Sequence, residues 1–310
     1  MWTFTSVFFK LLPIMLPNEP TNDFFDKRPF PLDSDLETIR CPLCGSGSTS
    51  IIHIRKPFQI VLCKDCGLSY LNPRLKEHVM HSVYEVREYF SAGDMTGYRD
   101  YTFQEKSLRI TFRSFLAKLK RLGFASGRLL EVGCGYGYFL DEARDFFPSL
   151  FGTELSSEAA SLAQKLPAVS IWTGDINSLP MGWSNFDVVV AINVIEHIYS
   201  PLEFLISLKQ RLRSDGRIVL ATPDFGSYWP KILGDKWPSF KIPEHVVFYN
   251  TKNLRLLLER AGFRNFQEIP FRHFFPLGLI AGKFGKNIRG RLGQIPVAIP
   301  KTMIALSAQK

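Results

Sequence analysis

The sequence lacks any uninterrupted apolar run of the ~20 residues that a membrane-spanning helix requires. Its apolar beginning, MWTFTSVFFKLLPIMLP, also lacks the features of an export signal. No basic residues precede the apolar stretch, Lys10 and Pro13 interrupt it, and no small-residue cleavage site follows it. We therefore expect a cytoplasmic protein rather than a secreted or membrane-spanning one.

Acidic residues are missing from residues 271–310, a segment that contains seven lysines and arginines. The rest of the chain is nearly balanced, with 31 basic and 29 acidic residues, so the net charge of +9 is a local feature. A protein that binds nucleic acid over a large surface spreads its basic residues more widely. The charge pattern therefore argues against nucleic acid as the main partner.

Cysteine is scarce, and four of the five cysteines fall in two short motifs. CPLCG and CKDCG place Cys41, Cys44, Cys63 and Cys66 in two CxxCG knuckles, which is the spacing of a zinc ribbon. Each CxxC pair lets two thiolates face one cation, and the glycine that follows allows a tight turn. Four cysteine ligands leave no open coordination position, so we expect structural zinc. The alternatives are a redox pair or unpaired thiols.

After residue 128, short apolar runs alternate with amphipathic stretches. Strands are expected at 128–132, 149–153, 169–173, 186–192 and 217–222, and helices near 137–147, 156–166, 201–212 and 251–261. This alternation predicts an α/β fold with a doubly wound, Rossmann-like parallel sheet, in which ligands bind at the carboxyl ends of the strands. Two more strands are expected at 262–271 and 302–308.

These patterns divide the chain into four parts. We expect an N-terminal arm and linker at 1–40, the zinc ribbon at 41–74, a helical connector at 75–122 and the Rossmann-like domain at 123–310. A basic and apolar insertion at about 272–301 interrupts the last part. The insertion suits an anionic membrane surface or an anionic acceptor, and the alternative is a solvated lid that covers the domain.

The loop after the first strand of the Rossmann-like domain reads RLLEVGCGYGYFL and has the spacing GxGxG. Dinucleotide-binding loops usually read GxGxxG and present a helix N-terminus to a pyrophosphate. Here Glu131 precedes Gly133 by two residues, and its carboxylate would repel a pyrophosphate but attract a cationic ligand. S-adenosylmethionine carries an ammonium and a sulfonium group and no phosphate, so the charge favours it over NAD.

Polar residues also end the next three strands. Glu154 ends the second strand, where a carboxylate can accept hydrogen bonds from ribose hydroxyls, and Asp175 follows the third, within reach of an adenine amino group. The fourth strand ends in a polar edge with Asn193, Glu196 and His197, where a methyl group would be presented. Taken singly, each acid has a plainer alternative as a helix N-cap or a solvated turn residue.

Together these motifs resemble those of class I S-adenosylmethionine-dependent methyltransferases. The resemblance covers about residues 128–270 and rests on LLEVGCGYGYF, GTELS, GDI, FDVVVAINVIEHI and LRSDGRIVLATP. CPLCG…CKDCGLSYLNPR before this region and PEHVVFY after it are similar to a narrower bacterial group. That group joins a zinc ribbon to the same fold and is often found among sugar and polysaccharide genes. Deoxysugar C-methyltransferases combine a zinc ribbon and this fold in a similar way.

The resemblance implies a contact for each matched residue. The methionine part of the cofactor would lie against Glu131, Gly133, Gly135 and Gly137, with Cys134 as a small packing residue. The ribose would contact Glu154, and the adenine would contact Asp175 and the backbone of Ile176. Leu155 would also belong to the cofactor site. Asn193 would complete the cofactor site.

Methyl transfer from a sulfonium is an in-line displacement, and a hydroxyl or carbon acceptor also needs a base. In the similar sugar methyltransferases, the Glu-His pair of the PEHVVFY motif lies at the acceptor site. This implies His245 as the base, with Glu244 orienting its ring. His197 is the other candidate base, and its alternative is a helix-start residue bonded to backbone.

We therefore expect an enzyme that methylates a small molecule, a sugar, or a glycan- or lipid-linked acceptor, in the cytoplasm or at the inner membrane surface. One alternative is an RNA methyltransferase that recognises nucleic acid through its ribbon, but segment 41–67 offers only Arg55, Lys56 and Lys64 as basic residues. A second alternative is a non-catalytic platform that keeps the fold. The set of cofactor-facing acids argues against it.

Overall fold

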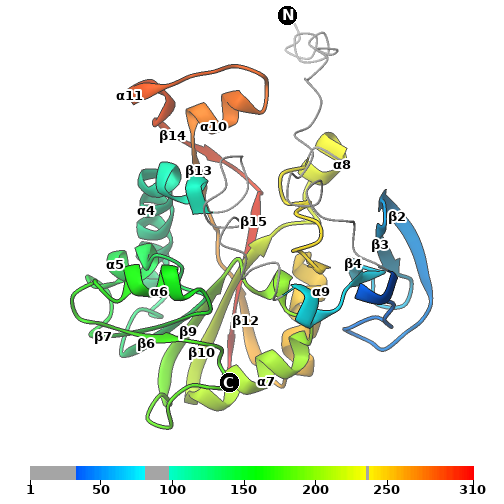
Figure 1. Ribbon diagram of the computed structural model, residues 1–310. Helices are drawn as coiled ribbons and strands as arrows, with labels where there is room; N and C mark the ends of the chain where they lie inside the picture. Colours follow the sequence, from blue (N-terminus) through cyan, green and yellow to red (C-terminus); the bar gives the residue numbers. More distant parts are fainter. Residues whose placement is uncertain (1–32, 81–97, 235–236) are drawn as a thin grey trace, which may run out of the picture.

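The computed structural model describes residues 33–80, 98–234 and 237–310 (Figure 1). Most of the expected N-terminal arm and part of the expected helical connector lie outside these residues. Within them, no helix is both long enough and apolar enough to cross a membrane.

A seven-stranded sheet forms the centre of the structure. Its strands are β6 (Arg128–Val132), β7 (Ser149–Glu154), β8 (Val169–Thr173), β9 (Phe186–Ile192), β10 (Leu212–Pro223), β12 (Arg264–Glu268) and β15 (Met303–Gln309). They lie in the order β12-β15-β10-β9-β6-β7-β8. The first five strands in sequence are parallel, as the alternation predicts.

The predicted parallel sheet is extended by β15, for which the sequence indicates no direction and which runs antiparallel to both β10 and β12. No helix crosses the sheet between β12 and β15, so the chain returns beside β12 as in a wide hairpin. The sheet is therefore mixed. The connection between these two strands leaves the sheet at the carboxyl ends of the parallel strands, since Met303 at the start of β15 pairs with Pro223 at the end of β10.

Alternating residues of the central strands bury the two faces of the sheet under different helices. Leu129, Val188 and Val190 pack on one face, beneath α4 (Tyr98–Arg121) and α5 (Tyr138–Ala143). Leu130 and Val189 pack on the other face, beneath α7 (Pro201–Arg211) and α9 (Thr251–Arg260). The period-two alternation of a strand buried on both sides explains why these segments read as continuous apolar runs. Residues 157–163 form α6, between β7 and β8.

A second, four-stranded sheet contains the cysteine motifs. Its strands are β2 (Thr49–Arg55), β3 (Phe58–Cys63), β4 (Ser69–Leu71) and β11 (Val247–Phe248), in the order β11-β4-β3-β2. Short strands β1 (Leu36–Glu37) and β5 (Arg74–Leu75) pair beside it. Because β11 comes from the PEHVVFY segment, the ribbon sheet is completed by a strand that follows β10 of the central sheet in sequence.

The segment between β12 and β15 forms a small structured unit rather than an extended loop. It contains β13 (His273–Pro276), α10 (Leu277–Gly282), α11 (Gly290–Gly293) and β14 (Pro296–Ile299), and β13 pairs with β14. The backbone N–H of Phe274 donates to Thr111 Oγ1 of α4 at 2.9 Å. Figure 1 shows the unit at one end of the molecule, above α4.

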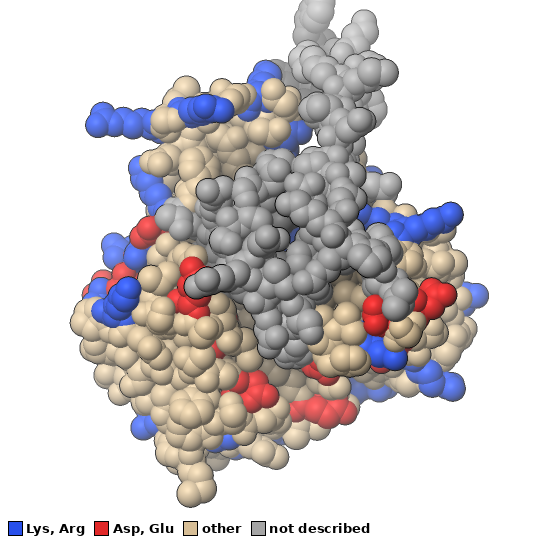
Figure 2. Space-filling model, in the orientation of Figure 1, with Lys and Arg blue, Asp and Glu red and all other residues tan. Residues whose placement is uncertain are grey.

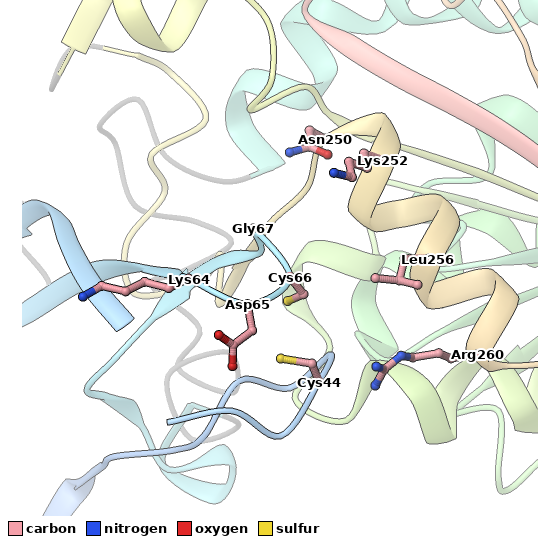
Figure 3. Close-up of a pocket in the computed structure, with 9 residues that line it drawn as sticks. All are labelled: Cys44, Lys64, Asp65, Cys66, Gly67, Asn250, Lys252, Leu256 and Arg260. Carbon is pink, nitrogen blue, oxygen red and sulfur yellow. The ribbon is translucent and has the colours of Figure 1, made fainter. Parts of the chain in front are cut away.

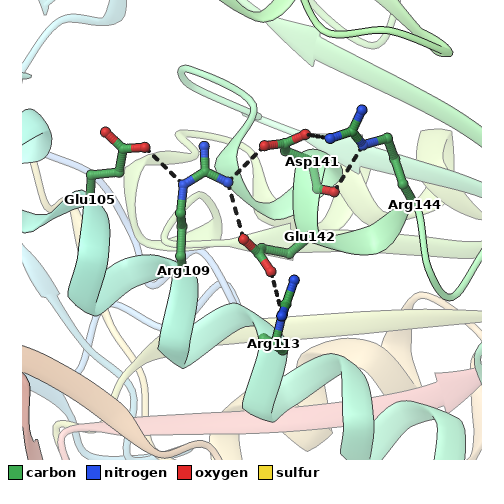
Figure 4. Close-up of polar contacts among 6 residues, drawn as sticks. All are labelled: Glu105, Arg109, Arg113, Asp141, Glu142 and Arg144. Atoms are coloured by element: carbon green, nitrogen blue, oxygen red, sulfur yellow. Dashed lines mark hydrogen bonds and ion pairs between the residues drawn. The ribbon is translucent and has the colours of Figure 1, made fainter.

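An arginine-centred ion-pair network holds α4 against α5 (Figure 4). Arg109 contacts Glu105 at 2.8 Å, Asp141 at 2.7 Å and Glu142 at 3.1 Å, and Arg113 contacts the second oxygen of Glu142 at 2.6 Å. The side chain of Glu142 is only 9% exposed, so these ion pairs are less screened by solvent than surface pairs. Because α5 begins directly after the glycine motif, this network also fixes the glycine loop.

Candidate functional site

The glycine motif forms a tight loop between β6 and α5. Gly133, Gly135 and Gly137 have φ angles of 71°, 53° and 79°, a region that favours glycine. A Cβ atom at Gly133 would lie 2.7 Å from Cγ2 of Val194, which follows β9. The loop therefore lies directly against the segment that carries the expected polar edge.

Glu131 places an unpaired carboxylate oxygen beneath this loop. The side chain is 4% exposed, and its Oε2 atom has no hydrogen-bond partner among the described residues. Burial, and then the negative charge of Glu154, raise the pKa of Glu131 well above its ordinary value. A buried carboxylate of this kind is stabilised by a cationic group, so the site fits the ammonium group of S-adenosylmethionine and disfavours a pyrophosphate.

Glu154 ties the end of β7 to the same loop. Its Oε2 accepts a hydrogen bond from the N–H of Gly135 at 2.8 Å, and its Oε1 accepts from the N–H of Ser156 at 2.9 Å. Burial raises the pKa of Glu154, although these backbone donors oppose the shift. The next residue, Leu155, is 64% exposed and offers an apolar surface beside the carboxylate.

Asp175 and Ile176 follow β8 in a turn. Asp175 Oδ1 accepts from the N–H groups of Asn177 at 3.0 Å and Ser178 at 2.8 Å. Burial raises the pKa of Asp175, but the hydrogen bonds outweigh it and the net shift is downward. The ionised carboxylate thus fulfils the turn role that was the alternative in the sequence, and its adenine contact stays a prediction. Ile176 is buried beside it.

Cys134 lies within the glycine loop and is 2% exposed. Burial, and then the charges of Glu131 and Glu154, raise the pKa of its thiol. A buried, protonated thiol is a poor nucleophile, which agrees with a packing role.

The polar edge after β9 brings together the side chains of Glu196, His197 and His245. Glu196 and His197 belong to the single-turn helix η2 (Ile195–His197), and His245 comes from the PEHVVFY segment. The two imidazole rings meet edge to face, with 4.7 Å between their centroids. Ligand atoms of all three residues lie within 4.8 Å of one another, close enough to bind one cation. Asn193, at the end of the same strand, is exposed and donates its N–H to Ala221 O at 2.8 Å.

Burial sets the protonation of this cluster. Burial, and then the charge of Lys241, lower the pKa of His197 to about 4, and burial and His197 lower the pKa of His245 well below its ordinary value. Burial also raises the pKa of Glu196 to about 7, and its Oε2 accepts from Thr222 Oγ1 at 2.9 Å. Both imidazoles are therefore neutral at neutral pH, which is the form that can accept a proton.

Glu244 contacts the cluster in a different way from the one expected. Its backbone oxygen lies 3.1 Å from Nδ1 of His197, which fixes that ring rather than the ring of His245. Among the described residues, no hydrogen bond from a ring N–H of His245 to the Glu244 carboxylate is present. The orientation of His245 by the Glu244 side chain stays a prediction.

The four motif cysteines converge as the zinc ribbon predicts. Sγ of Cys41 lies 3.5 Å from Sγ of Cys66, and Sγ of Cys44 lies 3.4 Å from Sγ of Cys63. Burial raises the pKa of the Cys63 thiol, but backbone N–H donors of Cys66 and Asp65 outweigh it and lower the pKa to about 7. This arrangement fits a four-thiolate zinc site.

Val246 connects the ribbon to the polar edge. Its N–H donates to Glu196 O and its carbonyl accepts from the N–H of Leu71 in β4, both at 2.9 Å. On the other side of the ribbon, Asn253 Nδ2 donates to Gly67 O at 3.4 Å. Sequence patterns assign Val246 no role, because nothing local signals a partner about 175 residues away. They place Glu196 at the edge but assign it no function, because its partners Thr222 and Val246 come from later segments of the chain.

A groove lies between the knuckles and α9 (Figure 3). It is lined by Cys44, Lys64, Asp65, Cys66, Gly67, Asn250, Lys252, Leu256 and Arg260. Cys44 and Cys66 are half-buried at this groove, so solvent reaches this side of the cysteine cluster.

Sequence and structure comparisons relate this chain to known proteins. A family described as a methyltransferase domain matches residues 104–268. A protein of Mycolicibacterium smegmatis named "Probable S-adenosylmethionine-dependent methyltransferase" is 30% identical over 161 residues, which are 52% of this chain and 61% of that protein. A tRNA U34 carboxymethyltransferase of Pseudoalteromonas translucida is 30% identical over 45% of each chain.

The magnesium protoporphyrin IX methyltransferase of Synechocystis, solved with SAH bound, has a TM-score of 0.48 at 14% identity, over 76% of this chain and all of that one. The chain thus spans less than two thirds of the first curated relative, and none of these matches identifies an acceptor.

Proposed function

Because the chain belongs to the methyltransferase-domain family, we propose that it transfers a methyl group from S-adenosylmethionine to a sugar or a glycan- or lipid-linked acceptor. The observation that carries the cofactor assignment is the unpaired, buried Oε2 of Glu131 beneath the glycine loop. S-adenosylmethionine would supply the methyl group as a sulfonium substituent. The acceptor class follows from the zinc-ribbon resemblance.

The residues of this chain divide the remaining work. Glu131 would bind the ammonium group of the cofactor. Glu154 would accept hydrogen bonds from the ribose hydroxyls, and Leu155 would lie beside the ribose. Asn193 would border the same site, and Asp175 and Ile176 would contact the adenine. Of the two neutral histidines we assign the base to His245, with His197 packed against it.

We propose that the four cysteines hold a structural zinc ion and that the ribbon, residues 41–74, acts as part of the catalytic unit rather than as a separate module. The support is β11, which pairs with β4 of the ribbon and begins two residues after His245. Residues 75–122 would then connect the ribbon to a catalytic domain at 123–310.

Labelling experiments test the acceptor class. Zinc-loaded protein is incubated with methyl-labelled S-adenosylmethionine and a host cell extract, and the label is fractionated into RNA, lipid, glycan and small-molecule pools. We expect label in the glycan, lipid or sugar pools. The control is Glu154→Ala, which leaves the N–H groups of Gly135 and Ser156 without their acceptor and should remove the label. Label confined to RNA would contradict the proposal and favour the alternative of an RNA acceptor.

Replacement of Glu131 by glutamine should weaken cofactor binding while stabilising the free protein. A hydrogen bond to a charged group contributes about 1.5–3 kcal/mol, so we expect the dissociation constant for S-adenosylmethionine to rise roughly 10- to 100-fold. The folded state of the free protein raises the pKa of Glu131, so this residue favours folding below its ordinary pKa of 4.5, and that contribution is lost as the pH rises.

Calorimetric titration and thermal unfolding between about pH 5 and 8 measure both effects. The introduced glutamine side chain does not titrate. At the upper end of this pH range, the variant should therefore unfold at a higher temperature than the parent protein, and its thermal midpoint should depend less on pH. Unchanged affinity for the cofactor would show that Glu131 does not contact it.

A further inference from the structure

The end of the molecule that carries the glycine loop also exposes large apolar side chains. The segment between β12 and β15 exposes Phe284 by 65%, Leu292 by 57% and Ile295 by 44%. Helix α8 (Trp229–Leu233), which follows β10, exposes Ile232 by 67%. Trp229 Nε1 donates to Pro300 O at 2.7 Å, so α8 and this segment lie side by side.

Basic residues alternate with these apolar ones. Lys283, Lys286, Arg289 and Arg291 are all exposed, and they flank Phe284 and Leu292 in sequence. The sequence has no acidic residue after Glu268. Figure 2 shows Lys and Arg side chains on this projecting unit and no acidic side chain on its visible face. Large apolar side chains exposed among basic residues indicate an interaction surface rather than a lid that contacts only solvent.

We propose that α8 and residues 272–301 form a surface that binds an anionic lipid bilayer. Lysine and arginine attract anionic headgroups, and exposed Phe, Leu and Ile side chains enter the boundary between headgroups and acyl chains. Aliphatic side chains contribute little to binding a phosphate backbone, so the composition fits a membrane better than RNA. Helices α10 and α11 have only six and four residues, so anchoring comes from a folded knob rather than from one amphipathic helix.

This surface lies at the carboxyl ends of the parallel strands, as do the glycine loop and His197. Binding would therefore bring the proposed site to the membrane, where a lipid-linked acceptor is presented. Only this last step rests on the proposed function. The binding itself is measured without cofactor or acceptor, so its failure and a failure of methyl transfer are distinguishable.

Vesicle sedimentation of the full chain tests the surface. We expect co-sedimentation with vesicles of phosphatidylcholine containing about 30% phosphatidylglycerol, and much weaker binding to phosphatidylcholine alone or at high salt. The double variant Phe284→Ser/Leu292→Ser should bind roughly tenfold more weakly. Met181→Ser is the matched control, because Met181 is 96% exposed but precedes β9, at the opposite end of the sheet.

A second pair of variants tests the charge. Each lysine near an anionic bilayer contributes about a fivefold gain in binding, so Lys283→Ala/Lys286→Ala should weaken it roughly 25-fold. Lys165→Ala, before β8 at the opposite end, should bind like the parent protein. The proposal is overturned by equal binding to neutral vesicles, by absence of sedimentation, or by equal losses in the controls. Binding of an RNA oligonucleotide by protein that does not bind the vesicles would also overturn the proposal.

Discussion

Replacement of Cys63 by serine is expected to remove zinc, disorder the ribbon and abolish methyl transfer, while leaving cofactor binding largely intact. Structural zinc in small cysteine sites binds with an apparent free energy of about 10 kcal/mol or more, and that energy is available to folding. Cys63 ends β3 and Cys66 lies three residues before β4, so a metal ion held by these cysteines fixes the turn that joins the two strands. We expect the thermal midpoint to fall by more than about 10 °C.

Activity should be lost because the ribbon positions the polar edge. Leu71 of β4 donates to Val246 O, and Val246 donates to Glu196 O, so displacement of β4 frees both the His245 segment and the backbone of η2. The glycine loop has separate supports in Glu154 and in the α4–α5 ion pairs. We therefore expect methyl transfer to fall more than about 100-fold while the dissociation constant for S-adenosylmethionine changes less than about fivefold.

Metal analysis, thermal unfolding, calorimetric titration and the methyl-transfer assay give the four readouts. Cys134→Ser is the matched control, because Cys134 is a buried cysteine that takes no part in the cluster, and it should retain zinc. A chelator added to the parent protein should reproduce the Cys63→Ser result, since Cys44 and Cys66 border an open groove. A Cys63→Ser protein that keeps full activity would contradict the coupling of ribbon and site.

The local patterns of the sequence predict the five parallel strands and the helices between them, because each pattern depends on neighbouring residues alone. The alternation that buries Val188 and Val189 on opposite faces is visible in the sequence itself. The direction of β15 is not, since its two sheet partners are set by packing against β10 and β12 rather than by its own residues. The same limit explains the folded insertion, whose short elements depend on contact with α4.

The candidate site divides in the same way. The CxxCG spacing and the GxGxG loop encode a cation site and a tight turn within a few residues, so both could be predicted. The meeting of His197 with His245 joins two segments about 50 residues apart, through contacts such as the hydrogen bond from Val246 N–H to Glu196 O, which no local pattern encodes. The sequence could name these histidines as candidates, but it could not show that the rings are in contact or that burial of His245 lowers its pKa.

Replacement of His245 by glutamine is expected to lower kcat by roughly 10²- to 10⁴-fold, the usual contribution of a general base, with little change in cofactor affinity. The matched variant is His197→Gln, which removes the neighbouring ring. If His245 is the base, His197→Gln should cost less, because that ring contributes packing and a contact with Glu244 O. A larger loss in His197→Gln would reverse the assignment.

The pH dependence of kcat separates a buried base from an ordinary histidine. Burial lowers the pKa of His245, so the ring stays neutral and able to accept a proton at pH values where an exposed histidine is already charged. We expect kcat to stay nearly constant from about pH 8 down to about 6 and to fall only at lower pH. A profile that halves near about pH 6.5 would mean that the acceptor meets a solvated histidine. Glu196→Gln should leave kcat largely unchanged if His245 alone accepts the proton, and should lower kcat as strongly as His245→Gln if the cluster holds a cation.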